Sequence, residues 1–236
     1  MSDHCKIIED IADFHAHVLP GADHGSYSVT ESVKQLALAA EYGVKRIVAT
    51  PHFYPNAHTV EAFLSRRALA CEMLAPALFD GAPSLALGAE VLLCNNIDKM
   101  PGLENLFIEG TSTLLLEMPY DDFSSDYVKS VERLTRSGVN VVLAHADRYE
   151  LDKVNSMIDV GAKVQLNASS LCSFFKRRRL RSLLDRGAVV ALGSDIHNVD
   201  NDAYKNFCKA QGVIKNYLSD IKQESDKLLE IAFLKK

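Results

Sequence analysis

The sequence of 236 residues contains no tryptophan and no large excess of charge of either sign. A membrane-spanning helix needs about 20 consecutive apolar residues, and no apolar run here approaches that length. The 26 basic and 31 acidic residues give a net charge of −5, which provides no general attraction to nucleic acid or to anionic membranes. The N-terminal stretch MSDHCKIIED lacks the apolar core of a signal peptide. We therefore expect a cytoplasmic protein with no membrane span and no nucleic-acid partner.

The distribution of cysteine gives a second exclusion. The cysteines are odd in number, are scattered and form no CxxC pair, which predicts reduced thiols rather than a disulfide framework or a thiolate zinc site. Cys172 and Arg178 have the C-x5-R spacing of cysteine-dependent tyrosine phosphatases, but the bulky residues between them are typical of a helix start, not of a tight phosphate loop. The five cysteines are Cys5, Cys71, Cys94, Cys172 and Cys208.

A short pattern recurs along the chain: an amphipathic helical stretch, a glycine and then an apolar strand. The glycines are Gly43, Gly138, Gly161 and Gly187. Because glycine readily adopts the left-handed conformation that ends helices, each marks a predicted helix end. The near-continuous apolar strands that follow are typical of parallel strands covered by helices. No linker or composition break interrupts this pattern, so we expect one domain over residues 1–236.

Alternating strands and helices predict an α/β fold with parallel strands, either a barrel or a doubly wound sheet. About seven strands are expected from this pattern. The strands not preceded by one of the four glycines are residues 11–18, 84–90 and 113–118. Helices are expected over residues 28–42, 59–78, 125–136, 151–160 and 173–185, with one or two more after residue 200.

Histidine is concentrated near the N-terminus. The stretch ADFHAHVLPGADHGS holds His15, His17 and His24, out of eight histidines in the chain. Residues two apart share one face of a strand, so Asp13 is predicted to lie on the same side as His15 and His17. The residues predicted for the other side are Ala12, Phe14, Ala16 and Val18. Such a strand would present two imidazoles side by side to a metal; the alternative is a half-buried strand whose histidines bind nothing.

Further histidines and carboxylates follow the other predicted strands. The carboxyl ends of parallel strands meet at one rim, where active sites are built. One histidine there would be unremarkable, but a joint placement on one rim is hard to explain by packing. Imidazole and carboxylate ligands without thiolate suit catalytic zinc, manganese or iron. Besides His15 and His17, the residues at or just after strand ends are His52, Glu90, Glu117, His145, Asp195 and His197, with His24 in the first loop.

Seven motifs resemble, in order, those of the PHP (polymerase and histidinol phosphatase) superfamily: DFHAHVLPGADHG, ATPHFYP, GAE, LLLEMPY, LAHADRY, QLNASS and GSDIHN. The chain is most similar to the bacterial CpsB/CapC branch of manganese-dependent tyrosine phosphatases of capsule and exopolysaccharide synthesis. The resemblance implies a distorted (β/α)7 barrel that holds two or three divalent ions, with manganese as the first choice and iron or zinc as alternatives. The implied ligands are His15, His17, Glu90 and Asp195 for one metal, Glu90, Glu117 and His145 for a second, and His24, His52 and His197 for a third.

The chain departs from the family's motifs at two places. Where the family usually reads DDG, this chain has His24 between Asp and Gly, so that an imidazole replaces a carboxylate ligand. An arginine common after the DxHN motif is absent, and Asp202 stands near its place. Phosphate binding then rests mainly on Arg148, the predicted catalytic residue, whose alternative role is a surface ion pair with Asp147 or Glu150.

Three more features bear on the predicted site and its surroundings. Phe53 and Tyr54 are predicted either to form a wall for a phenyl ring or to pack within their loop. Asn167 and Ser169 follow the sixth strand, where they can hydrogen-bond to metal ligands. The basic run at residues 176–181 is predicted to be a solvated helix face, or else to recruit an acidic phosphorylated tail.

The predicted function is metal-dependent hydrolysis of a phosphate monoester. Clustered divalent ions bind phosphate oxygens, lower the pKa of a bridging water and stabilise in-line displacement. The resemblance implies phosphotyrosine on a protein as the substrate, in particular on a bacterial tyrosine autokinase. The alternatives are a small-molecule phosphatase acting on histidinol phosphate or a nucleotide, and a non-catalytic metal-binding domain. An amidohydrolase is disfavoured, because Glu117 stands where those enzymes use a carboxylated lysine.

Overall fold

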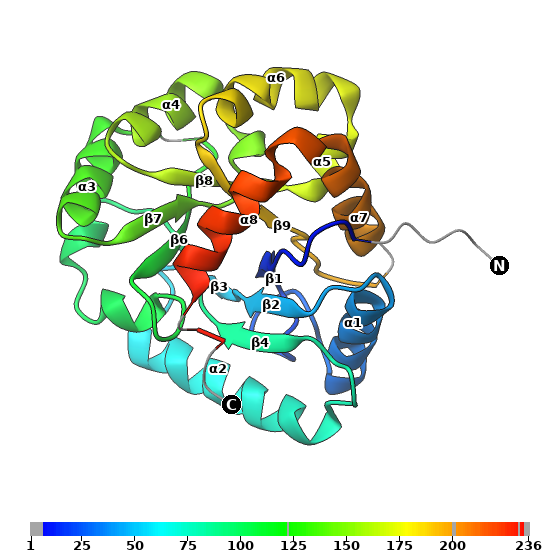
Figure 1. Ribbon diagram of the computed structural model, residues 1–236. Coiled ribbons are helices and arrows are strands. Elements are labelled where there is room, and N and C mark those ends of the chain that lie inside the picture. The colour runs from blue at the N-terminus through cyan, green and yellow to red at the C-terminus, as the bar shows by residue number, and fades with distance from the viewer. Residues whose placement is uncertain (1–6, 122, 200–201, 231, 234–236) are drawn as a thin grey trace.

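The structure, a computed structural model, describes residues 7–121, 123–199, 202–230 and 232–233. In these residues nine parallel strands form one curled sheet surrounded by helices (Figure 1). The hydrogen-bonded order is β3-β5-β6-β7-β8-β9-β1-β2-β4. The strands are β1 (Asp13–Ala16), β2 (Arg46–Ala49), β3 (His52–Phe53), β4 (Ser84–Leu87), β5 (Glu90–Leu92), β6 (Thr113–Glu117), β7 (Asn140–Leu143), β8 (Lys163–Asn167) and β9 (Val189–Gly193).

The sheet closes into a ring when two pairs of successive strands are each counted as one interrupted segment. β2 and β3 are separated only by Thr50 and Pro51, and β4 and β5 only by Gly88 and Ala89. The ladder continues across both breaks, because the Gly88 N–H donates to the Ala49 carbonyl (2.9 Å) and the Glu90 N–H to the Pro51 carbonyl (3.1 Å). The nine strands therefore amount to seven segments, with β1 paired to both β9 and β2. The expected distorted (β/α)7 barrel is confirmed.

Apart from the last helix, the helices cover the outside of this barrel (Figure 1). Most of the expected boundaries are confirmed within two residues; the second helix instead ends at Leu74 and continues as a 3-10 turn that contains Pro76. The helices are α1 (Val29–Glu41), α2 (Val60–Leu74), α3 (Ser125–Arg136), α4 (Leu151–Asp159), α5 (Ala168–Cys172), α6 (Phe174–Asp185), α7 (Ala203–Val213) and α8 (Lys215–Leu229). The 3-10 turns are η1 (Ala75–Ala77), η2 (Ile97–Lys99), η3 (Leu103–Leu106) and η4 (Ala146–Arg148).

Glycine ends four of these helices as predicted. Gly43, Gly138, Gly161 and Gly187 have φ angles of 88°, 92°, 101° and 64°. Side chains other than glycine rarely adopt these angles, so each glycine lets the chain turn from the helix into the following strand at little cost. The turns therefore deliver every one of these strands into the barrel in the same direction.

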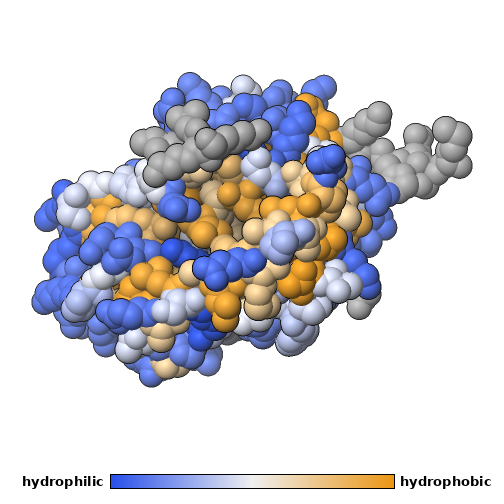
Figure 2. Space-filling view, turned by 90° about the horizontal axis from the view of Figure 1, so that it is seen from below, coloured by the Kyte–Doolittle hydropathy of each residue, from blue (hydrophilic) through white to orange (hydrophobic). Residues whose placement is uncertain are grey.

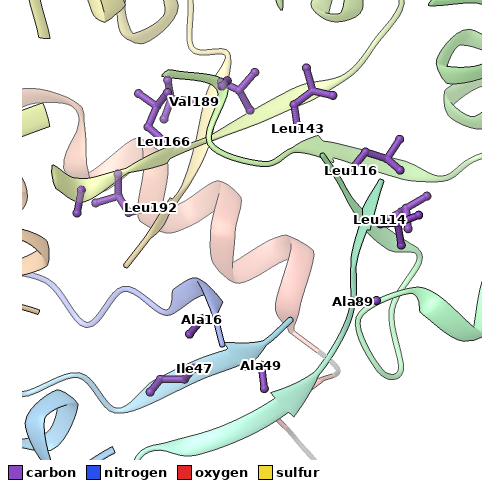
Figure 3. Packing of buried hydrophobic residues seen from close by; sticks show 14 of the residues in the cluster. Ala16, Ile47, Ala49, Ala89, Leu114, Leu116, Leu143, Leu166, Val189 and Leu192 are labelled. Carbon is purple, nitrogen blue, oxygen red and sulfur yellow. The ribbon is translucent and has the colours of Figure 1, made fainter. Parts of the chain in front are cut away.

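Hydrophobic side chains form an outer layer between strands and helices. Leu114, Leu116 and Leu143 belong to it and point away from the barrel interior (Figure 3). A second, inner layer takes residues from strands around the whole ring, which can meet only inside the barrel. The residues of the inner layer that lie in strands or directly beside them are Ala12, Phe14, Val48, Ala86, Leu115, Val142, Ala144, Val190 and Ala191.

Helix α8 closes the amino end of the barrel. It crosses in front of the strands in Figure 1, and its Leu229 packs into the inner layer. The hydroxyl of Thr113, at the start of β6, donates to the Leu228 carbonyl (3.1 Å). The inner layer and α8 together fill this end, so that the carboxyl ends of the strands form the accessible rim.

The predicted alternation along β1 is wrong at one point. Ala12 and Phe14 lie in the inner layer, whereas Ala16 and Val18 lie in the outer layer. The pairing of β1 with β2 shifts register between Asp13 and Ala16, and such an irregularity changes which face a residue occupies.

The state of the cysteines corrects one expectation. Cys71, Cys94 and Cys172 carry free thiols, as predicted. Cys208 is disulfide-bonded, which corrects the expectation of a reduced thiol there. Cys5 lies outside the described residues.

No helix in the described part of the chain is long and apolar enough to cross a membrane. Seen from below, where α2 lies, the surface has hydrophobic residues at its centre and hydrophilic residues around them (Figure 2).

Candidate metal centre

The predicted metal ligands all lie at the carboxyl rim. The structure places His15 in β1 and His17 just after it, His52 in β3, Glu90 in β5 and Glu117 at the end of β6. His145 follows β7, Asp195 and His197 follow β9, and His24 lies in the loop between β1 and α1. The rim therefore collects in one place side chains that are far apart in the sequence.

Glu90 is the centre of the arrangement. Its Oε2 lies 3.0 Å from His15 Nε2, 3.3 Å from His17 Nε2 and 2.9 Å from His52 Nδ1. Its Oε1 lies 2.7 Å from His145 Nε2. Glu90 is completely buried, which alone would raise its pKa, but the neighbouring histidines lower the pKa well below the ordinary value. Glu90 is therefore an anion inside a ring of imidazoles.

The tautomers of His15 and His17 are fixed by their outer hydrogen bonds. Gln165 Oε1 accepts from the His145 backbone N–H (2.7 Å), so this oxygen can only accept from His15 Nδ1 (3.2 Å). His17 Nδ1 donates to the carboxylate of Asp23 (2.7 Å). When both rings are neutral, both Nε2 atoms are left with lone pairs, and they lie 3.0 Å apart. Two facing lone pairs beside a carboxylate repel one another unless a cation lies among them.

Other atoms of the cluster also lack a hydrogen bond. Glu90 Oε2 and His52 Nδ1 are buried and have no hydrogen-bond partner. Buried polar atoms are almost always paired, so exceptions call for a missing ligand. Four groups of three residues have ligand atoms within 4.8 Å of one another: His17, His52 and His197; His15, His17 and Asp195; His15, Glu90 and His145; and His52, Glu90 and Glu117. The donor set of imidazoles and carboxylates fits divalent metal ions.

His24 lies at the edge of this cluster. Its ring stacks on His52, with centroids 4.6 Å apart and planes at 10°, and lies 4.9 Å from the ring of His197. Among the described residues, none of the four groups includes His24; the group that holds His52 and His197 contains His17 instead. The side chain is exposed. The role of His24 as a ligand stays a prediction.

His145 and Asp195 have strained backbones. Their φ angles are 31° and 53°, in the left-handed region that residues with a side chain rarely adopt. Such strain persists where surrounding contacts fix it, often at functional sites. Here the Asp195 N–H donates to the His15 carbonyl (2.8 Å), which places the Asp195 carboxylate 3.7 Å from His15 Nε2 and 3.5 Å from His17 Nε2.

Arg148 contacts the cluster from the solvent side. Its guanidinium forms an ion pair with Asp195 Oδ2, and its side chain remains 41% exposed. Neither predicted surface partner holds it: the carboxylate of Asp147 accepts instead from the Asn167 N–H (2.8 Å) and the Ser170 hydroxyl (2.6 Å). Arg148 is thus held at the mouth of the site with N–H groups still available.

Burial and the charged groups of the cluster shift the pKa values of two of its histidines. Burial lowers the pKa of His145, but Glu117 and Glu90 outweigh it and raise the pKa to about 9. Burial and the neighbouring His17 lower the pKa of His197 to about 4, so His197 is neutral. Its Nδ1 donates to the Asp195 carbonyl (3.1 Å), which leaves Nε2 free to bind a metal.

Sequence reasoning missed two residues that orient ligands. Asp23 holds His17 and also accepts from the backbone N–H of His52 (2.9 Å) and of Gly25 (2.9 Å). Gln165 holds His15, as described above, and its amide donates to Asn167 Oδ1 (3.0 Å). The position of Asp23 beside His24 was the available signal. Gln165 opens the QLNASS motif, but no role was predicted for it.

Other predicted residues divide between the site and the core. Asn167 donates to Asp195 Oδ2 (2.8 Å), as expected of a residue that supports a ligand. Ser169 is exposed, and its neighbour Ser170 makes the contact to Asp147 instead. Tyr54 stacks on His52, with centroids 5.3 Å apart, but Phe53 is buried against Phe63 and forms no wall of the site.

Cys172 is not arranged as a nucleophile. Burial raises the pKa of its thiol above the ordinary value, and the thiol donates to the Asn206 carbonyl (3.5 Å). Residues 174–178 belong to helix α6 and do not wrap a phosphate site. The C-x5-R spacing is therefore incidental, as predicted.

Comparison with known proteins gives consistent relatives. The chain is 26% identical over 229 residues to the tyrosine-protein phosphatase CpsB of Streptococcus pneumoniae, with 86% of this chain and 92% of the relative covered. It is 25% identical over 198 residues to the tyrosine-protein phosphatase YwqE of Bacillus subtilis, with 79% and 77% covered.

Solved structures support the fold. A structure from a study of YwqE and CpsB, described as unique metal-dependent tyrosine phosphatases, matches with a TM-score of 0.80 at 19% identity, covering 93% of this chain and 94% of that chain. The histidinol phosphate phosphatase of Lactococcus lactis, bound to zinc, L-histidinol and phosphate, matches with a TM-score of 0.57 at 14% identity, covering 88% and 94%. The family described as capsular polysaccharide synthesis, CpsB/CapC, matches residues 11–224. Because this match spans most of the chain, the protein belongs to the CpsB/CapC family.

Proposed function

We propose that the protein is a metal-dependent phosphatase that hydrolyses phosphotyrosine on a protein substrate. The observation that carries this proposal is the cluster around Glu90, in which imidazole nitrogens and carboxylate oxygens converge and Glu90 Oε2 and His52 Nδ1 are buried without a hydrogen-bond partner. The curated relatives named tyrosine-protein phosphatase support the choice of substrate.

The ligand sets follow the resemblance. We propose His15, His17, Glu90 and Asp195 for one ion, Glu90, Glu117 and His145 for a second, and His24, His52 and His197 for a third. When bound, divalent ions attract phosphate oxygens and lower the pKa of a bound water. We propose manganese as the ion, with iron or zinc as alternatives.

Arg148 acts on the substrate in this proposal. It is already oriented by Asp195, and its remaining N–H groups can donate to the oxygens of the phosphoryl group. Charge that develops on these oxygens in the transition state strengthens such contacts. The leaving group is a phenolate with a reference pKa of about 10, so the chain needs no strong general acid at the site.

The cellular setting is proposed from the family. The description of the family as capsular polysaccharide synthesis supports a bacterial tyrosine autokinase of capsule or exopolysaccharide synthesis as the substrate protein. We propose a cytoplasmic location, where the phosphotyrosine of such a kinase is accessible.

The likeness to histidinol phosphate phosphatase keeps a small-molecule substrate as the second candidate. The experiment compares turnover of a phosphotyrosine peptide and of histidinol phosphate by protein freed of metal with a chelator and reloaded with manganese. The proposal expects activity on the peptide that disappears with the chelator and returns with manganese. A clear preference for histidinol phosphate would assign the second function.

Two variants control the mechanism. Glu90→Gln keeps the size of the side chain but removes the charge at the centre of the cluster, and should abolish activity. Cys172→Ser and thiol alkylation should leave activity near normal. Loss of activity in Cys172→Ser with unchanged metal content would contradict the proposed chemistry.

A further inference from the structure

Helix α6 carries the strongest local concentration of positive charge in the described part of the chain. Five of the six residues from 176 to 181 are lysine or arginine, although the whole chain has a net charge of −5. The side chains of Lys176 and Arg178 form no hydrogen bond or ion pair with any described residue. Arg181 lies 3.5 Å from Asp185, whose other oxygen accepts from the Tyr217 hydroxyl (2.5 Å). The charge of this helix is therefore mostly unbalanced.

This pattern disfavours the helix itself. Arg177 and Arg178 lie one turn before Arg181, and like charges at this spacing repel by roughly 0.2–0.5 kcal/mol per pair. The first turn has no acidic residue, and the residue before it makes no side-chain cap. Positive charge near a helix start is unfavourable as well. The charges thus oppose local stability, which is typical of residues kept for binding.

A groove lies along the same face of α6. It has a volume of about 470 Å³ and lies between α6 and the junction of α7 with α8. Arg177, Arg178 and Arg181 line one side together with Phe174, and Val213 lies on the other side. Phe174 is 62% exposed and Phe175 beside it 83% exposed, so apolar surface borders the positive charge. The groove therefore offers guanidinium groups and an aromatic ring to the same ligand.

A short connection and hydrogen bonds link helix α6 to residues of the candidate metal centre. β8 ends at Asn167, which donates to Asp195, and only helix α5 and Ser173 separate it from the start of α6. Arg179 of α6 donates to the backbone carbonyls of Asp147 and of Tyr149 (3.3 Å for the latter), which flank Arg148. A chain bound at Arg148 therefore lies close to Arg179 of α6.

We propose that this groove binds an acidic segment of the phosphoprotein substrate, adjacent to the phosphotyrosine. Carboxylates of the segment pair with Arg178 and Arg181, and an apolar side chain packs against Phe174. The inference rests on the proposed phosphatase function and specifies the substrate further. A recessed groove between helices suits a peptide, whereas a flat lipid surface would leave its inner wall unused.

The test compares three substrates in manganese-loaded protein: p-nitrophenyl phosphate, a phosphotyrosine peptide with acidic flanks, and the same peptide with the acids replaced by their amides. The variant is Arg178→Glu/Arg181→Glu, which spares Arg177 and Arg179 because these hold backbone carbonyls. The matched control is Lys129→Glu/Arg136→Glu on α3, which changes the net charge equally at exposed positions.

Wild type and control should prefer the acidic peptide by roughly 10-fold in kcat/KM, mainly through KM, as expected of charge complementarity. The α6 variant should lose this preference and turn over p-nitrophenyl phosphate normally. A preference that persists in the α6 variant, or that falls equally in the control, would overturn the proposal. Binding to phosphatidylserine vesicles that the α6 variant alone loses, with unchanged peptide preference, would assign the face to a membrane instead.

Direct binding separates this inference from the proposed function. Fluorescence anisotropy of the unphosphorylated acidic peptide needs no catalysis. Wild type should bind this peptide and the α6 variant should bind it at least about 10-fold more weakly. Wild type that turns over no phosphate ester yet binds the peptide would refute the proposed function alone. Equal binding by both proteins would refute the groove alone.

Discussion

Replacing Arg148 tests whether the chain itself contributes to transition-state stabilisation. Removing one donor to a developing oxyanion typically lowers kcat by about 10²- to 10³-fold. Arg148 is 41% exposed and shares its charge with Asp195, so the lower end of this range applies. We expect Arg148→Ala to lower kcat/KM for a phosphotyrosine peptide by roughly 10²-fold. Arg148→Lys keeps the charge but loses the planar fork, and should lie between alanine and wild type.

The assay is steady-state kinetics with metal content measured on the same preparations. Metal content should be unchanged, because Arg148 is not a ligand. Arg186→Ala is the matched control. Arg186 is also a partly exposed arginine, and it pairs with the carboxylate of Asp159 (3.2 Å) away from the rim. Near-normal kcat/KM in Arg148→Ala, or an equal loss in the control, would refute the reasoning.

Three other predictions concern the supports of the site and the surface. Asp23→Asn removes the charge that orients His17 and should weaken metal binding by about 10- to 100-fold, measured by competition with a chelator. Gly25→Ala would place a Cβ 2.4 Å from His17 Cβ, so the stability to urea should fall by about 1–3 kcal/mol, whereas Gly212→Ala, with its closest contact at 3.9 Å, should not lower it. Arg133 holds the pKa of Asp98 below its ordinary value. This ion pair therefore stabilises the fold at pH values above the pKa of Asp98 in the unfolded chain. The stabilisation is lost as the pH falls through the pKa of Asp98 in the folded protein. The difference in melting temperature between wild type and Asp98→Asn should therefore be present at pH 7 and shrink on acidification; a difference that grows would contradict it.

Local sequence signals were sufficient for most of the architecture. Gly43 and Gly138 marked helix ends because only glycine adopts the required φ angles cheaply. The side chains at the strand ends could be grouped from the sequence alone, because parallel strands share one rim. Glu90 and Glu117 were included on this basis, and the structure brings both beside the histidines.

The remaining features depend on contacts that are distant in sequence. Gln165 opens the QLNASS motif, but its partner His15 is 150 positions away, so the local sequence does not reveal its role. The breaks at Pro51 and Ala89 and the register shift in β1 arise from closing the ring, which periodicity along one strand does not describe. The burial of Phe53 depends on packing against Phe63, which the motif around His52 did not indicate.

The central claim is that the cluster around Glu90 holds divalent metal ions. Anomalous diffraction from crystals grown with excess manganese, for wild type and His24→Ala, tests it directly. The account predicts peaks at Glu90 flanked by His15 and by His145 in both proteins, and a further peak beside His52 and His197 that only wild type shows. Two peaks in wild type would contradict the role of His24. No peak at Glu90 would contradict the account as a whole.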